Sequence, residues 1–234
     1  MKKLLALWLL LPLWTMSQTN QNVLSYGRFV PKLDKIAEFE KAITNHHQKY
    51  HTDEWKANVW MVNSGPESVS YMIALGPHTW EQLDNRKTTP EHDADWQNCL
   101  KLVDKAYPQT YMVFQDDLST AKPGEFVEKV SVTRLYYKPG YGGKVSDAIK
   151  FLKKSWEGTN QSVAVYQAIN SGEPHYLIAV RHIGGWKEKT FGNYKPLREQ
   201  IGNDDFDNFI ELIRDYVSKS VGEMLMMRKD LSSK

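Results

Sequence analysis

"VNSGPESVSYMIAL" occupies residues 62–75, and "INSGEPHYLIAV" occupies residues 169–180. Both segments place an Asn-Ser-Gly triplet ahead of a run rich in apolar, aromatic and β-branched residues. Asn and Gly accept the positive φ angles of tight turns, so each segment predicts a β-hairpin with a buried second strand. The recurrence of one hairpin in two parts of the chain indicates a duplication.

The similarity between the two halves extends beyond the hairpins. Arg28 aligns with Arg134, 106 residues later. Further along, "DADWQNCLKLVDKAY" (93–107) aligns with "NDDFDNFIELIRDYV" (203–217). The matches keep their order, and the separation changes only where loops would absorb insertions. We therefore expect an internal repeat.

Each half shows the same succession of strand-like and helix-like patterns. We expect strands at 25–30, 57–63, 69–75, 110–115, 129–137, 162–170, 175–181 and 222–228, and helices near 36–50, 93–107, 145–156 and 204–219. The order is βαββαβ in each half, which is the ferredoxin-like unit. A single unit leaves one sheet face bare, and two units can bury these faces against each other.

The expected fold class is therefore α+β, with two tandem ferredoxin-like (βαββαβ) units packed sheet to sheet as a pseudo-dimeric α+β barrel. The expected segments are a signal peptide (1–17), an N-terminal extension (18–24), the first unit (25–116), a linker (117–128) and the second unit (129–232).

This element order, its tandem arrangement and the "KPG" turn at 138–140 resemble the dimeric α+β barrel superfamily. That superfamily includes the antibiotic-biosynthesis monooxygenases, stress-responsive barrel proteins, NIPSNAP-like proteins and haem-binding relatives of chlorite dismutase. The resemblance covers residues 25–232 and implies the fold. No catalytic signature of these families matches residue by residue, so their chemistry is an analogy only.

The N-terminus has the pattern of a secretory signal peptide. Lys2 and Lys3 precede an apolar run from Leu4 to Trp14, and small residues precede a cut near Ser17. The alternative of a membrane anchor needs roughly 20 apolar residues, which this run lacks. We expect a secreted or periplasmic protein without a membrane span.

Charge and cysteine content exclude two classes of protein. Without residues 1–17 the chain has 28 basic and 28 acidic side chains, so it lacks the basic excess typical of nucleic-acid binding. Cys99 is the single cysteine, so no internal disulfide can form. It aligns with Phe209 at a core-facing helix position, which favours an apolar filling role over a catalytic thiol.

Two aligned arginines are the main site candidates. Arg28 and Arg134 each lie within the first strand of a half. If they point between the sheets, they would present paired donors to a carboxylate or an acidic phenol. The alternative is that they lie near strand ends and reach solvent or an internal acid. The other candidates for lining such a cavity are Tyr26, Trp60, Tyr136, Tyr166 and His175, with Tyr71, Tyr111 and Gln167 also considered.

The segment "NHHQKYH" holds three histidines. His47 and His51 are four residues apart, as in metal-binding helix pairs, but they align with Lys153 and Glu157, which are residue types of solvated surfaces. We therefore expect both on the surface and no native metal site. His46 aligns with an apolar residue and is expected at the seam between helix and sheet.

The first functional hypothesis is binding of a small, partly apolar, acidic ligand between the sheets. The alternative is a cofactor-independent monooxygenase-like or isomerase-like enzyme, and a third hypothesis is a non-catalytic assembly module. Whether the protein is an enzyme stays undecided at this stage. We expect no cofactor, with haem left open through His46 or His175 as axial ligand, and a homodimer is also left open.

Overall fold

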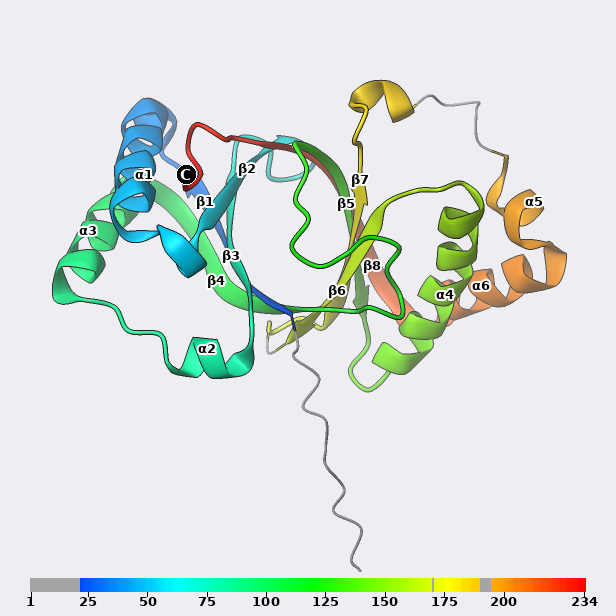
Figure 1. The fold of residues 1–234 in the computed structure, drawn as a ribbon. Helices are drawn as coiled ribbons and strands as arrows, with labels where there is room; N and C mark the ends of the chain where they lie inside the picture. The colour runs from blue at the N-terminus through cyan, green and yellow to red at the C-terminus, as the bar shows by residue number, and fades with distance from the viewer. Residues whose placement is uncertain (1–21, 170, 190–194) are drawn as a thin grey trace, which may run out of the picture.

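The computed structural model describes residues 22–169, 171–189 and 195–234. Within them the chain forms strands wrapped by helices (Figure 1). The strands are β1 (Val23–Pro31), β2 (Ala57–Ser64), β3 (Tyr71–His78), β4 (Val103–Phe114), β5 (Lys129–Tyr137), β6 (Val163–Ile169), β7 (His175–Arg181) and β8 (Val217–Met227). The helices are α1 (Ile36–Tyr50), α2 (Trp80–Asp84), α3 (Pro90–Leu100), α4 (Gly142–Gly158), α5 (Leu197–Ile201) and α6 (Asn203–Tyr216), with 3-10 turns at Leu33–Lys35, Asp53–Trp55 and Trp186–Lys189.

The strands form one closed antiparallel barrel in the order β1-β3-β2-β8-β5-β7-β6-β4. The two halves of the chain join where β2 pairs with β8 and β4 pairs with β6. The sheet is therefore continuous around the barrel instead of being two separate facing sheets. Closure gives the outer strands of each half hydrogen-bond partners and leaves no free sheet edge.

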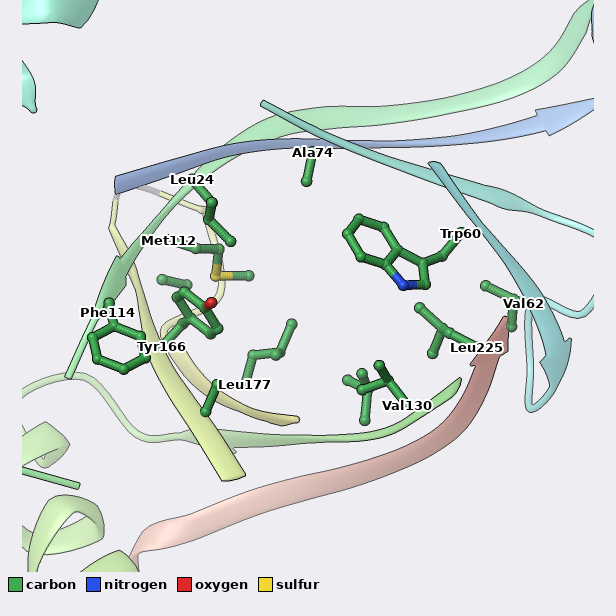
Figure 2. Packing of buried hydrophobic residues seen from close by; sticks show 13 residues of the cluster. Leu24, Trp60, Val62, Ala74, Met112, Phe114, Val130, Tyr166, Leu177 and Leu225 are labelled. Atoms are coloured by element: carbon green, nitrogen blue, oxygen red, sulfur yellow. The ribbon is translucent and has the colours of Figure 1, made fainter. Parts of the chain in front are cut away.

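Alternation along the strands separates the barrel interior from its outer face. In β1, Leu24 and Tyr26 belong to the interior cluster, whereas Phe29 packs outward against Trp96 of α3. Figure 2 shows the interior side chains converging from strands on all sides, with the Trp60 indole projecting from β2. The interior thus forms one hydrophobic cluster, and each half adds another beneath its helices.

The helices lie outside the barrel, α1 and α3 over the first half and α4 and α6 over the second (Figure 1). In α1, Phe39 and Ile43 are fully buried, and in α4 Val145 and Ile149 are fully buried. A spacing of four residues puts each pair on one face of its helix. This amphipathic pattern therefore predicts correctly which face meets the sheet.

The two hairpins expected from the repeated Asn-Ser-Gly triplets are present as β2–β3 and β6–β7. Gly65 has φ +121° and Gly172 has φ +80°, which are the positive values that favour glycine. Asn170 of the second triplet lies outside the described residues.

Two expected helix ends are wrong. Helix α3 ends at Leu100, not at residue 107, and β4 begins at Val103; likewise α6 ends at Tyr216, and residues 217–219 belong to β8. Residues 103–107 pair with β1, for example Ala106 with Phe29, and the start of β8 pairs with the end of β5. The ladders that close the barrel outweigh the helix-like pattern of these short segments.

Residues 117–128, the expected linker, connect β4 to β5 across one end of the barrel, where Phe126 and Val127 pack on the interior cluster. In Figure 1 this green segment passes in front of the strands. Among the described residues no helix has both the length and the apolar character needed to span a membrane. The expected signal peptide, residues 1–17, lies outside the described residues.

Candidate functional site

Arg28 and Arg134 both point into the barrel, where Glu223 of β8 bridges them. Arg28 Nη2 donates to Glu223 Oε1 at 2.6 Å, and Arg134 Nη1 donates to the other carboxylate oxygen. Strands β1 and β8 are not neighbours, so the side chains of Arg28 and Glu223 meet across the interior. The remaining bonds go from Arg28 Nε to Ser70 Oγ (3.0 Å) and from Arg134 Nη2 to the Tyr26 hydroxyl (3.1 Å).

This bridge changes the interpretation of the arginine pair. Burial alone would raise the pKa of Glu223, but hydrogen bonds and attraction from Arg28 and Arg134 lower it, so the carboxylate is charged. The donors that were expected to hold an acidic ligand are thus engaged by a buried internal acid. Of the two alternatives for the arginines, the structure shows pairing with an internal acid, Glu223, inside the barrel. One signal was available, since Glu223 alternates with Leu225 and Met227 in the apolar C-terminal part of β8.

The interior cavity lies beside this triad and is apolar. Its volume is about 70 Å³. Of the expected lining residues, Tyr26, Trp60 and Tyr166 contact this space, whereas Arg28, Arg134, Tyr136 and His175 do not. Tyr136 and His175 instead lie against each other, with ring centroids 4.8 Å apart.

A larger cleft opens on the outer face of the first half, between the sheet and helices α1 and α3. Its volume is about 510 Å³. The apolar lining comes from Phe29, Ile73, Leu75, Leu83, Trp96, Leu100 and Ala106, and the polar lining from Ser25, His46, His47, His51, Arg86, Thr88, His92, Tyr107 and Gln109. A concave site that combines apolar walls with convergent polar groups is a common form of small-molecule site.

Three histidine rings meet in this cleft. His46 of α1, His51 directly after α1 and His92 of α3 each provide a ring nitrogen, and these three nitrogens lie within 4.8 Å of one another. The Nε2 atoms of His46 and His51 are 3.2 Å apart. His92 Nε2 is buried and has no hydrogen-bond partner in the described part of the chain.

Each of these rings is held through Nδ1 by an oxygen atom. The contacts are His46 Nδ1 to Asp95 Oδ2 (2.8 Å), His51 Nδ1 to the Trp55 carbonyl (2.9 Å) and His92 Nδ1 to Asp93 Oδ1 (2.8 Å). Burial lowers the pKa of His46 despite the opposing bond from Asp95, and it lowers the pKa of His51 to about 3. Both rings are therefore neutral at pH 7.

The structure contradicts the expected exposure of two histidines. His47 and His51 are buried, and His47 Nδ1 lies 2.7 Å from the carbonyl oxygen of Leu231. The C-terminal segment packs beside α1 (Figure 1) and covers the helix face that the second half leaves to Lys153 and Glu157. Alignment of the halves could not show this cover. It did predict His46 correctly as buried.

Two further expectations concern Cys99 as a catalytic thiol and His46 or His175 as an axial ligand of haem. Burial raises the pKa of the Cys99 thiol to about 11, so the thiol stays protonated. His46 Nδ1 is engaged by Asp95, and its Nε2 lies 3.2 Å from His51 Nε2. Of the two axial ligands considered for haem, the other, His175, has a buried Nε2 without a hydrogen-bond partner in the described residues.

Solved structures with the same arrangement are found at low sequence identity. An anthrone oxidase-like protein has a TM-score of 0.59 and 10% identity over 90% of this chain and 92% of its own. A candidate monooxygenase from Fusobacterium nucleatum has a TM-score of 0.56 and 13% identity over 88% of this chain and 92% of its own. Another from Lactobacillus acidophilus has a TM-score of 0.54 and 11% identity over 91% of this chain and 95% of its own. This likeness shows a shared α+β barrel fold. No protein-family model and no curated protein matches the sequence.

Proposed function

We propose that the protein is an enzyme that oxidises or isomerises a small, electron-rich aromatic molecule in the cleft between the sheet and helices α1 and α3. The observation that carries the proposal is the convergence of His46, His51 and His92 on one apolar space. The fold likeness to candidate monooxygenases and to an anthrone oxidase-like protein supports the same reaction class.

The walls of the cleft suit an aromatic substrate with an acidic hydroxyl. Phe29 and Trp96 offer ring faces and edges, and Arg86 supplies a positive charge at the same space. The Arg86 guanidinium lies 4.8 Å from the Trp55 ring, and burial lowers its pKa. A partly desolvated cation favours the phenolate form of a bound phenol.

The histidine cluster can accept the proton that such a reaction releases. Asp95 orients His46 through Nδ1, as the acid does in a catalytic triad. Removal of a proton from an activated CH₂ group leaves a carbanion that reduces O₂. Conversion of CH₂ to C=O with release of one water balances atoms and electrons without a further reductant. Return of the proton to another carbon would instead give an isomer.

The proposed reaction is tested by oxygen consumption and product mass spectrometry with anthrone. His46→Gln should lower kcat about 100-fold or more, the usual contribution of a positioned base. His182→Gln, a buried histidine bonded to Ser131 on another part of the barrel, should leave the rate unchanged. The proposal is wrong if no substrate turns over, or if both variants behave alike.

The site belongs to the first half alone, which fits a duplicated scaffold. The matching βαββαβ orders and the aligned sequence support two tandem ferredoxin-like units. At the aligned positions of the second half, His46 and His51 are replaced by Leu152 and Glu157. In this view the second half keeps a packed contact between helix and sheet, and the first half has opened there into a cleft.

We further propose export after cleavage near Ser17, which N-terminal sequencing of the secreted protein would test.

A second candidate function is binding of a small apolar molecule inside the barrel. Tyr166 lines this cavity, and burial raises the pKa of its hydroxyl to about 12. Figure 2 shows its ring among apolar side chains. Small phenols or indole should raise Tm in the wild type and less in Tyr166→Phe; equal shifts would contradict this site. The assembly-module hypothesis predicted a barrel without a cavity, and the cavity gives it no support.

A further inference from the structure

The hydrogen-bond partners fix where the protons lie on the three histidine rings of the cleft. The Trp55 carbonyl and the carboxylates of Asp93 and Asp95 can only accept hydrogen bonds, so each Nδ1 carries the proton. In a neutral ring the other nitrogen, Nε2, then carries a lone pair. All three rings therefore present Nε2 as an acceptor.

These lone pairs leave the cluster electrostatically incomplete. The Nε2 atoms of His46 and His51 face each other at 3.2 Å with no proton between them. The His92 Nε2 is buried and lacks a partner among the described residues. Buried acceptors that are not satisfied destabilise the folded protein. A cation that accepts all three lone pairs would remove this destabilisation.

One pair of these rings has the spacing expected of two imidazole ligands on one metal ion, and the third ring nitrogen lies within 4.8 Å of both. Zn–N bonds of about 2.0–2.1 Å at the tetrahedral angle separate two ligand nitrogens by about 3.3 Å. The observed 3.2 Å between His46 Nε2 and His51 Nε2 is close to this value. Hydrogen bonds from Nδ1 to carboxylate or carbonyl oxygen are also the usual support of metal-bound histidines.

We propose that His46, His51 and His92 bind a divalent transition-metal ion, Zn²⁺ or a neighbour of it, through their Nε2 atoms, with the fourth position open to the cleft. Asp95, Asp93 and the Trp55 carbonyl orient the ligands, and the two carboxylates balance part of the charge of the ion. Cys99 lies near His46 and Asp95, in a separate grouping that includes neither His51 nor His92.

This inference rests on the proposed function only for what the ion does, not for whether it binds. An open position facing about 510 Å³ of accessible space admits water or a phenolic oxygen. A metal at this position lowers the pKa of either group. In the metal-loaded protein, such a bound group would replace the bare imidazole as the site of proton transfer.

The test uses untagged, chelator-stripped protein titrated with Co²⁺ and Zn²⁺, followed by visible spectroscopy, calorimetry and elemental analysis. We expect one ion per chain, a Co²⁺ spectrum of four-coordinate type and a rise in Tm with metal. His51→Ala should abolish binding, Asp95→Asn should weaken it roughly 10–100-fold, and His182→Gln should leave it unchanged. No binding by wild type, or unchanged binding by His51→Ala, would overturn the proposal.

A second variant keeps the test decisive if His51→Ala fails to fold. His92→Cys should still bind Co²⁺ and should add a sulfur-to-cobalt charge-transfer band that the wild type lacks. Absence of that band from folded, cobalt-loaded protein would show that residue 92 is not a ligand. Binding without turnover would contradict the proposed function alone, and turnover by a protein that binds no metal would contradict the metal site alone.

Discussion

Glu223 holds together two arginines that lie far from it in the sequence. The alignment of Arg28 with Arg134 predicted that the arginines share an environment, and both do point into the barrel. It could not predict the acid between them, because Glu223 comes from a strand in the second half whose counterpart in the first half carries no matching acid. A buried ion triad is a property of the closed barrel, in which strands that are not neighbours face each other.

Glu223→Gln should destabilise the protein by about 3–5 kcal/mol, because it leaves two buried guanidinium groups without their anion. Urea denaturation followed by circular dichroism measures this change. Glu125→Gln is the matched control, since its pair with Arg181 is half exposed on the acid side and should contribute at most about 1 kcal/mol. A loss for Glu223→Gln no larger than for the control would contradict the buried triad.

The same carboxylate predicts how stability depends on pH. The pKa of Glu223 is lowered on folding, so its contribution is complete above its ordinary value of 4.5 and is lost as the pH falls through the lower folded value. The difference in unfolding free energy between wild type and Glu223→Gln should therefore be constant from pH 7 to pH 5 and shrink below that range. A difference that grows with acid would have the wrong sign.

At the scale of elements, the sequence predicts most of the fold but not the ends of two helices. Helix α1 begins and ends where its apolar spacing indicates, and both hairpins follow their Asn-Ser-Gly triplets. Helices α3 and α6 end early because β4 and β8 extend to close the barrel. Those ladders join segments distant in sequence, so no local pattern could show them.

The two triplets offer a direct test of their turns. A Cβ on Gly65 would lie 2.8 Å from Glu223 Cγ and 3.0 Å from the Gly222 carbonyl oxygen, whereas a Cβ on Gly172 would meet no atom within 4 Å. Gly172→Ala should therefore cost about 1–2 kcal/mol from backbone strain alone. Gly65→Ala should cost clearly more, because strain and the contact add. Equal losses of stability in thermal unfolding would contradict the close approach.

At the scale of the whole molecule, the cleft with the three histidines lies in the first of two similar halves. Aligning the halves predicted the barrel and gave inward-pointing arginines as one of two alternatives, but it placed His47 and His51 on the surface. The alignment failed there because the C-terminal segment, with Leu231, covers α1 and has no equivalent over α4. His92 was passed over for a related reason: only the packing of α3 against α1 brings it to His46. The site therefore depends on contacts that differ between the halves.

The most direct test of the central claim is long-range ¹H–¹⁵N NMR of the histidine rings in untagged protein, recorded with and without Zn²⁺. The account predicts that with Zn²⁺ the rings of His46, His51 and His92 carry their proton on Nδ1, and that their three Nε2 signals shift on metal addition while those of His182 stay in place. An Nε2 proton on any of the three rings in the presence of Zn²⁺, or signals that do not respond to the metal, would contradict it.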